Sequence, residues 1–159
     1  MEVRSSRFGA LEVSPDKCIT MERPILGFES LKTFCLIARE EYRPFVWMQS
    51  VDHPDVAFVL ANPLLFFPDY HIEVHSKEIA ELGVVSTSSV ETWVIITIPD
   101  NPKEMTANLQ GPIIINIENR KAKQLVLVNS DYAVQHELFS AKNAELSASA
   151  SRDRELVGV

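Results

Sequence analysis

The chain has 159 residues, 46% of them hydrophobic and 23% charged, so one domain can build a core without a metal or a disulfide scaffold. Its 22 acidic and 15 basic residues give a net charge of −7, which argues against direct nucleic-acid binding because phosphate binders concentrate Lys and Arg. The polar N-terminus, and the lack of any run of about 20 apolar residues, predict neither a signal peptide nor a membrane span, so we expect a soluble cytoplasmic protein.

Short strands are the dominant local signal along the chain. Runs rich in Val, Ile, Phe and Trp alternate with turns that contain Pro, Gly, Asn or Asp. Two runs, 92–98 and 113–117, are largely apolar on both faces and should therefore lie at the centre of the sheet. In chain order, the predicted strands are 2–8, 11–13, 18–21, 34–39, 45–50, 56–60, 71–74, 92–98, 113–117 and 123–127.

Helical signals are few. Ser76 can cap a short helix over 76–82, and Gly83 can end it. Further single turns are predicted at 29–32 and 105–109. Because closure removes exposed strand edges, we expect a mainly β, compact, antiparallel β-barrel-like domain with one or two short helices.

The composition changes near the C-terminus. Residues 140–151 are almost all small or polar, so they have little apolar surface to offset the entropy lost on ordering. We therefore predict a β domain over 1–139 and a flexible Ala/Ser-rich tail over 140–159, with a frayed helix as the alternative for the tail.

Motifs for catalysis and cofactor binding are missing from the sequence. It has five glycines and no GxGxxG, phosphate-loop, GxSxG or paired CxxC pattern. His71 and His75 share one face of a predicted strand, but at about 13 Å apart they are too distant to chelate one ion. Cys35 lies in an apolar run and is predicted to be a small core residue. We expect no enzymatic activity, no cofactor and no metal.

Two segments are candidates for binding another protein. Residues 64–70 read Leu-Leu-Phe-Phe-Pro-Asp-Tyr, and large rigid side chains carry much of the energy of protein interfaces. The competing interpretation is that most of the apolar members are core, with Asp69 and Tyr70 at the polar edge of a groove. The second segment, 99–109, is a polar loop that contains the adaptable side chain of Met105.

A series of short motifs runs through almost all of 1–139. In chain order they are Phe8-Gly9-x-Leu11-Glu12-Val13, Leu26-Gly27-Phe28-Glu29, Phe45-x-Trp47-x-Gln49-Ser50, Ala57-Phe58, Asn62-Pro63, Phe66-Phe67-Pro68-Asp69-Tyr70, Ile98-Pro99, Met105-Thr106-Ala107-Asn108-Leu109, Gly111-Pro112-Ile113, Asn116, Arg120-Lys121-x-Lys123-Gln124 and Leu127-x-Asn129-Ser130-x-Tyr132. In this order and at these spacings, they resemble the FliW family of flagellar assembly factors.

The resemblance implies a β-barrel-like domain that binds two proteins and neither membrane nor RNA. One partner is flagellin, held through its C-terminal helical region. The other is CsrA, a small RNA-binding protein that represses translation of flagellin messages. Flagellin that accumulates would occupy the FliW-like protein and leave CsrA free to repress, and export of flagellin would reverse this. A dedicated flagellin chaperone without CsrA binding is the alternative, while an enzyme and a structural flagellar subunit are more distant rivals.

The candidate partner surface combines this resemblance with the two segments above. For every residue in it, packing or turn geometry is a competing explanation; for Asn108 the strongest rival is a loop cap that satisfies backbone groups. The predicted partner-binding residues are Phe67, Asp69, Tyr70, Met105, Asn108 and Asn129.

Overall fold

The structure, a computed structural model, describes residues 1–73, 76–83, 89–128 and 131–139. Its strands are β1 (Glu2–Ser5), β2 (Gly9–Glu12), β3 (Cys18–Arg23), β4 (Thr33–Ile37), β5 (Val46–Ser50), β6 (Ala57–Ala61), β7 (Val90–Thr97), β8 (Thr106–Ala107), β9 (Ile113–Asn116), β10 (Lys121–Gln124) and β11 (His136–Glu137). One α-helix, α1 (Ser76–Ala80), and 3-10 turns at Pro15–Lys17, Glu40–Tyr42, Pro63–Leu65 and Pro102–Glu104 complete the described elements.

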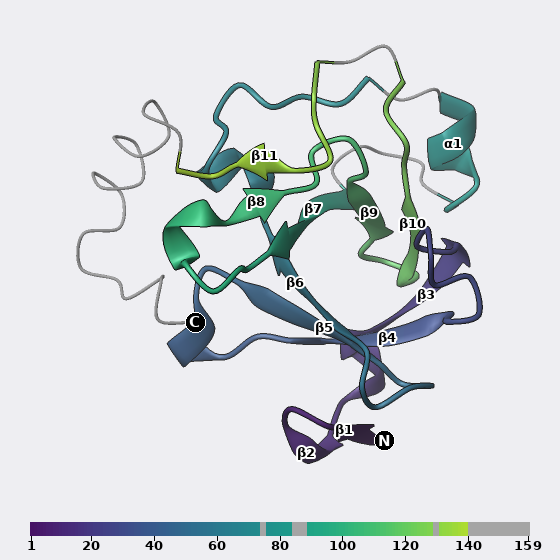
Figure 1. Ribbon diagram of the computed structural model, residues 1–159. Coiled ribbons are helices and arrows are strands. Elements are labelled where there is room, and N and C mark those ends of the chain that lie inside the picture. Colours follow the sequence, from purple (N-terminus) through teal and green to yellow (C-terminus); the bar gives the residue numbers. More distant parts are fainter. Residues whose placement is uncertain (74–75, 84–88, 129–130, 140–159) are drawn as a thin grey trace.

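Seven strands close into a barrel, in the order β3-β4-β5-β6-β7-β9-β10 (Figure 1). β10 returns to pair with β3 in parallel, while every other neighbouring pair in the ring is antiparallel. The two-residue strands β8 and β11 continue the sheet outward from β7. The predicted mainly β, barrel-like fold is therefore confirmed, with one short helix.

The interior of the barrel is filled by alternate residues of its strands. Because side chains on a strand point to opposite faces with a period of two, every second residue reaches this space. All four residues of β9 are buried, as its two-faced apolar sequence predicted. In β7 the expectation holds for Val94 and Ile96, whereas Glu91 and Thr97 are exposed. The inner cluster comprises Ile19, Met21, Phe34, Met48, Leu60, Ile113, Ile115 and Ala122, with Ile25 and Leu31 closing one side.

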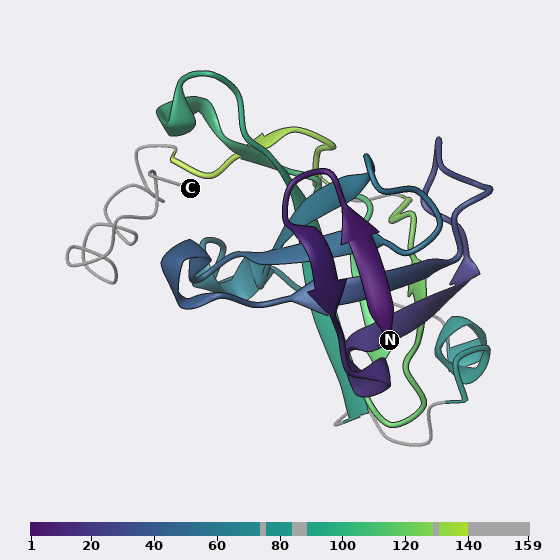
Figure 2. The ribbon, with the colours of Figure 1, turned by 90° about the horizontal axis from the view of Figure 1, so that it is seen from below.

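A hairpin formed by β1 and β2 lies outside the barrel, across β4 and β5 (Figure 2). Val3 and Val13 pack there against Cys35, which is buried as predicted. Cys35 lies directly opposite Cys18 in the register of β3 and β4, and the two are joined by a disulfide that the sequence alone did not predict. The loop of the hairpin reaches the 51–55 turn, where the Ser6 amide donates to the Pro54 carbonyl over 3.0 Å.

A second apolar layer covers the outer face of β5, β6 and β7. It is built from segments that follow these strands in sequence and fold back over them. The phenol of Tyr70 donates to the Leu109 carbonyl over 2.7 Å and ties two of the segments together. The layer buries Phe45, Val59, Phe66, Phe67, Tyr70, Val94, Ile96, Met105, Leu109, Leu125, Leu127 and Leu138, among others.

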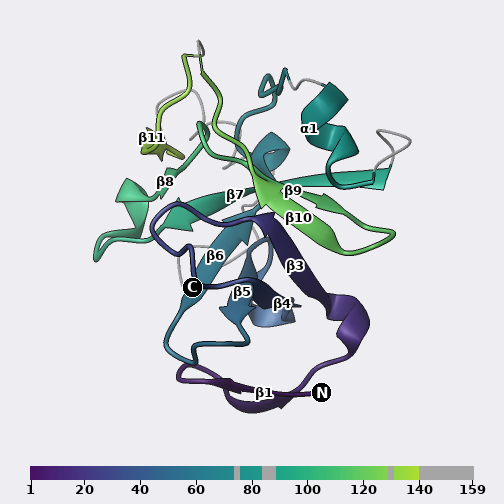
Figure 3. The ribbon, with the colours of Figure 1, turned by 90° about the vertical axis from the view of Figure 1, so that its right-hand side faces the viewer.

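Helix α1 sits on the other side of the barrel from the hairpin (Figure 3). Lys123, on β10, is 1% exposed, and its ammonium donates to the Glu81 carboxylate over 2.9 Å and to the Glu78 carbonyl over 3.1 Å. Arg23 holds the same carboxylate with two hydrogen bonds of 2.9 and 3.1 Å. Hydrogen bonds from Arg23 and then Lys123 lower the pKa of Glu81 from 4.5 to about 2. We call Arg23, Glu81 and Lys123 the ion cluster.

Several sequence predictions need correction at element level. The predicted strand at 71–74 is wrong for 71–73, since the described segment pairs with no strand and the His71 amide donates to the Tyr132 hydroxyl. The turn predicted at 105–109 contains β8 instead. The predicted helix over 76–82 is confirmed as α1. Residue 74 and the proposed tail, 140–159, lie outside the described residues, so the division at 139 stays a prediction.

β8 and β11 escaped prediction because two-residue strands leave no alternation to detect. Over the described residues, no helix has the length and apolar character needed to cross a membrane.

Candidate partner-binding surface

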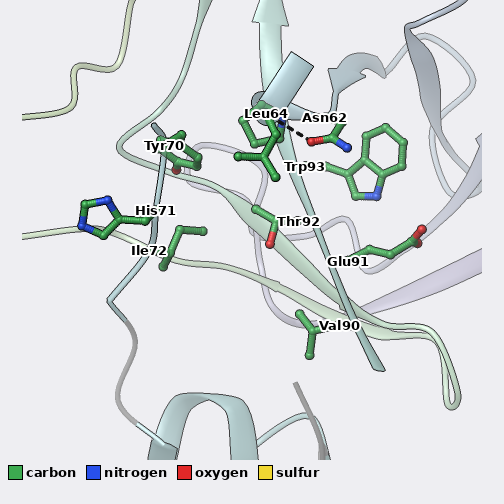
Figure 4. A pocket seen from close by; sticks show the side chains of 10 residues that line it. Asn62, Leu64, Tyr70, His71, Ile72, Val90, Glu91, Thr92 and Trp93 are labelled. Atoms are coloured by element: carbon green, nitrogen blue, oxygen red, sulfur yellow. Dashed lines mark hydrogen bonds between the residues drawn. The ribbon is translucent and has the colours of Figure 1, made fainter. Parts of the chain in front are cut away.

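A groove lies where β6 ends and β7 begins (Figure 4). Three segments line it: the turn after β6, the chain at 70–72 and the first half of β7. Its volume is about 480 Å³. Figure 4 shows the Leu64 side chain between Tyr70 and the indole of Trp93. The lining residues are Asn62, Pro63, Leu64, Tyr70, His71, Ile72, Val90, Glu91, Thr92 and Trp93, and we call this hollow the β6–β7 groove.

The local sequence explains why β6 stops at the groove. Pro63 has no amide hydrogen, so the strand cannot continue its ladder through this position. The Asn62 side chain instead accepts a hydrogen bond of 3.0 Å from the Leu64 amide and starts a 3-10 turn. The turn leaves Leu64 54% exposed and Leu65 50% exposed. Leu64 thus lines the groove while half exposed to solvent, and Leu65 beside it in sequence is exposed to a similar extent.

β7 carries an open edge beside the same groove. Its pairing with β6 covers three residues, ending at Ala61 opposite Val94. The preceding residues, Val90 to Trp93, pair with β9 on the other side. Within the described part of the chain, no strand lies on the β6 side of these four residues. Such an edge presents backbone groups to which an extended segment could hydrogen-bond.

Tyr70 forms the floor between the groove and the outer apolar layer. It is buried, and its ring centroid lies 4.6 Å from that of Tyr132. Burial raises the pKa of the Tyr70 phenol, followed by a smaller effect of Tyr132. The hydroxyl therefore stays protonated and acts as a donor to Leu109 throughout the physiological range. Tyr70 fixes the wall of the groove more than it offers a titrating group.

The predicted partner-binding residues fall into different environments. Phe67 and Met105 are buried, the latter completely, and both belong to the outer apolar layer. Asn108 accepts a hydrogen bond of 2.9 Å from the Gly111 amide, which is the loop cap proposed as its competing role. Asp69 is exposed and sits directly before Tyr70 at the groove.

Asn129 lies outside the described residues. The structure thus brings Tyr70 to the groove, with Asp69 directly before it in sequence, and packs Phe67 and Met105 in the outer apolar layer. Contact of any of these six residues with a partner stays a prediction.

The sequence placed Leu64 and Leu65 in a candidate binding segment, with burial in the core as the competing interpretation for Leu64, and both side chains are half exposed. Sequence reasoning missed a second feature of the groove. The unpaired edge of β7 could not be predicted, because the apolar sequence of 92–98 indicates a strand that is paired on both sides along its whole length. Pro63 carried a usable signal, since a proline directly after a strand marks where pairing stops.

The groove has the chemistry of a binding surface. Its walls combine leucine, isoleucine, valine and tryptophan side chains with a few polar groups. In the described residues, no group of three His, Cys, Asp or Glu side chains is arranged to hold a metal ion. His71 is exposed and contacts the Asp69 carbonyl, while His75 lies outside the described residues.

Comparison with known proteins gives a consistent result. The family model described as FliW protein matches residues 2–138. The flagellar assembly factor FliW of Thermoanaerobacter pseudethanolicus is 39% identical over 150 residues, which cover 93% of this chain and 100% of that protein. The corresponding protein of Caldanaerobacter subterraneus subsp. tengcongensis is 40% identical over 146 residues, covering 91% of this chain and 97% of its own. A crystal structure of the flagellar assembly factor FliW aligns with a TM-score of 0.82 and 34% identity, covering 89% of this chain and 99% of that chain.

Proposed function

The chain belongs to the FliW family of flagellar assembly factors, and we propose that it works there as a non-enzymatic, cytoplasmic regulator that binds two proteins in turn. One is CsrA, whose repression of flagellin translation it relieves. The other is flagellin, which competes for it through its C-terminal region. The observation that carries the proposal is the half-exposed Leu64 in the lining of the β6–β7 groove, with the half-exposed Leu65 next to it in sequence.

The groove suits the flagellin side of the proposal. A terminal helix that is amphipathic and still unassembled has an apolar stripe to bury, and an apolar groove with a polar rim is a fitting receptor. Leu64 offers apolar area in the groove, with exposed Leu65 next to it in sequence, and Glu91 provides an acidic group in the lining. Burying two such leucines on complex formation favours binding by a few kcal/mol at most before ordering costs.

The net charge of −7 suits the CsrA side. An RNA-binding protein must be basic where it meets phosphates, so an acidic protein docked near that surface would attract it and repel RNA. Exclusion of one partner by the other requires either a shared site or negative coupling between two sites. A shared groove is the simpler arrangement.

A calorimetric titration tests the proposal. The purified chain is titrated with CsrA from the same organism, alone and after saturation with flagellin. We expect binding tighter than about 1 μM that saturation with flagellin abolishes. Absence of heat with CsrA together with clear flagellin binding would leave the alternative, a dedicated flagellin chaperone.

The groove is tested by the double variant Leu64→Ser and Leu65→Ser. The matched control is Leu26→Ser, because Leu26 is 67% exposed but does not line the groove. We expect the double variant to weaken flagellin binding at least about tenfold, while the control binds as the parent does. Equal losses in both would point to a general surface effect and remove the groove from the mechanism.

A further inference from the structure

The open edge of β7 presents the backbone groups of two residues, Val90 and Thr92. In an antiparallel strand, the N–H and C=O groups of successive residues point alternately to the two sides. The Ser89 carbonyl accepts from the Ile117 amide over 3.0 Å, so it points to the β9 side. The backbone groups of Val90 and Thr92 therefore point to the other side, which is the β6 side. Both residues are partly exposed and line the β6–β7 groove.

The turn after β6 cannot satisfy these backbone groups. The register of β6 and β7 would place Pro63 opposite Thr92, but a proline has no N–H to donate. The Pro63 carbonyl is already used, since it accepts from the amides of Phe66 and Phe67 over 3.2 and 2.8 Å. Over the described residues, Thr92 thus has no strand partner on this side. An edge of this kind favours the addition of an extended segment.

One segment of this chain has the composition of such a strand. Residues 140–151 are almost all small or polar, whereas 156–159 read Leu-Val-Gly-Val. Valine is enriched in strands because its branched side chain packs well on a pleated surface. If 154–159 is extended, Arg154 and Leu156 share one face and the two valines share the other, because side chains alternate.

The edge of β7 has two faces that match these two faces. Figure 4 shows Glu91 and Trp93 on one side of β7, and Val90 and Thr92 on the other. The first side offers an exposed carboxylate and an aromatic ring, which complement the arginine–leucine face of the segment. The second side adds Leu64, which is 54% exposed, and complements the valine face.

The described chain ends close to the groove. Phe139, its last residue, packs against Phe66 with ring centroids 6.4 Å apart, and Phe66 bonds to Pro63, which lines the groove. Residues 140–153 span at most about 46 Å when extended. A domain over 1–139 has a radius of gyration of about 14 Å, so 154–159 can reach the edge. Tethering gives such a segment an effective concentration on the order of 1 mM.

We propose that residues 154–159 of this chain add to the open edge of β7 as a short strand and occupy the β6–β7 groove until a partner displaces them. The main chain of the segment then pairs with Val90 and Thr92. Docking is independent of the proposed function, but its regulatory effect rests on that function, because it takes flagellin to bind in the same groove.

The size of the effect follows from the tether. With an effective concentration near 1 mM, an intrinsic dissociation constant of about 0.5 mM keeps the groove occupied in about two thirds of the molecules. About one third are then open, so flagellin binds about threefold more weakly than to a groove without this competitor. The same open fraction slows hydrogen exchange of the covered amides about threefold.

Amide hydrogen exchange on the intact chain tests docking in the absence of any partner. Leu156→Asp places a charge in the segment, and Leu146→Asp is the matched control, because it makes the same change outside the segment. We expect Leu156→Asp to speed exchange of the Val90 and Thr92 amides at least about threefold. The control should exchange at these two positions as the parent does.

Two further measurements fix the site of docking. The amides of Glu91 and Trp93 point to β9, so their exchange should be the same in all variants. A synthetic peptide with the sequence of residues 152–159, added at about 2 mM to the Leu156→Asp chain, should restore the slow exchange of Val90 and Thr92.

Three results would overturn the proposal. The first is equal exchange at Val90 and Thr92 in the parent and in Leu156→Asp. The second is an equal acceleration in Leu146→Asp, which would mark a general effect of charge in the tail. The third is loss of protection when the parent is diluted about tenfold, which would make a second copy of the chain the occupant.

A titration with flagellin separates this inference from the proposed function. Leu156→Asp should bind flagellin about threefold more tightly than the parent, and Leu146→Asp should bind it equally. Faster exchange in Leu156→Asp without tighter flagellin binding would support docking and overturn the groove as the flagellin site. Unchanged exchange, together with weaker flagellin binding by the Leu64→Ser and Leu65→Ser double variant, would overturn docking and leave the proposed function standing.

Discussion

Two buried polar regions of this protein differ in how completely they are paired. In the ion cluster, the buried ammonium of Lys123 is hydrogen-bonded to Glu81 and to the Glu78 carbonyl, and both carboxylate oxygens of Glu81, at the surface, are hydrogen-bonded as well. On β5, Trp47 and Gln49 each keep one buried atom without a partner among the described residues. The charged region is satisfied, and the neutral region is not.

The difference follows from the cost of leaving a buried group unpaired. A charge placed inside a protein must be paired locally, because an unpaired buried charge costs far more than an unpaired neutral group. The ion cluster meets this requirement and fastens α1 to β3 and β10. A neutral donor and acceptor can remain unpaired at a cost of about 1–3 kcal/mol each. Removal of a polar group should therefore cost more stability in the first region than in the second.

The largest effect is expected for Lys123→Ala. It removes a buried four-carbon stem and leaves the Glu78 carbonyl and one bond to Glu81 unmade, so we expect a loss of about 3 kcal/mol in the free energy of unfolding. Urea denaturation followed by tryptophan fluorescence measures it. Lys123→Met is the matched control, because it keeps the stem and should lose clearly less. Equal stability of the parent and Lys123→Ala would show that the ion cluster does not hold the fold.

The barrel itself could be predicted from the sequence, but the ion cluster could not. Continuous apolar runs at 34–39, 45–50 and 56–60, separated by turn residues, give the strands, and most residues on both faces of these strands are buried or part-buried. Lys123 falls in a predicted strand, yet nothing local shows that it is buried, since it lies on the outer face of β10 and is covered by the segment that contains α1. Its burial depends on Glu81, which is 42 residues away in sequence and is brought close only when the barrel closes.

The next largest change in the free energy of unfolding is expected for Gln49→Met. The substitution removes a donor shared by three carbonyls and, at the same time, removes the unpaired oxygen. The first change destabilises and the second stabilises, so we expect a net loss of about 1 kcal/mol in urea denaturation. Because the side chains are similar in volume, packing changes little. A loss as large as that of Lys123→Ala would show that Gln49 is mainly structural.

Glu81→Gln tests how the charge of Glu81 contributes to the free energy of unfolding as the pH changes. The folded pKa of Glu81 lies below its ordinary value of 4.5, at about 2, so ionised Glu81 stabilises the fold above pH 4.5, and this contribution is lost as the pH falls toward 2. We expect the stability difference between the parent and Glu81→Gln to be constant near neutrality and to shrink between these two pH values. Urea midpoints across that window measure it. A difference independent of pH would mean that the charge of Glu81 contributes nothing.

The candidate sites were only partly predictable, because the burial of their residues depends on contacts between distant parts of the chain. Tyr70 lines the β6–β7 groove, and Asp69 precedes it in sequence, whereas their contact with a partner stays a prediction. Met105 looked like an adaptable loop residue but packs completely inside, since the loop folds back on the barrel. The burial of Trp47 could not be predicted, because it involves Arg7 and Phe8 of the hairpin loop, which lie about 40 positions away in sequence.

The smallest effect on stability is expected for Trp47→Phe, and it distinguishes the two regions most directly. Replacing the indole by phenyl removes an unpaired buried donor, which favours folding, and removes packing area against Arg7 and Phe8, which opposes it. The two terms have similar size, so the free energy of unfolding should change by less than about 0.5 kcal/mol. In the ion cluster, deletion of one donor costs stability because the donor is used. Here a donor should be removable at almost no cost to folding, because no described group accepts a hydrogen bond from it. A loss of more than about 2 kcal/mol would instead place Trp47 with ordinary core residues.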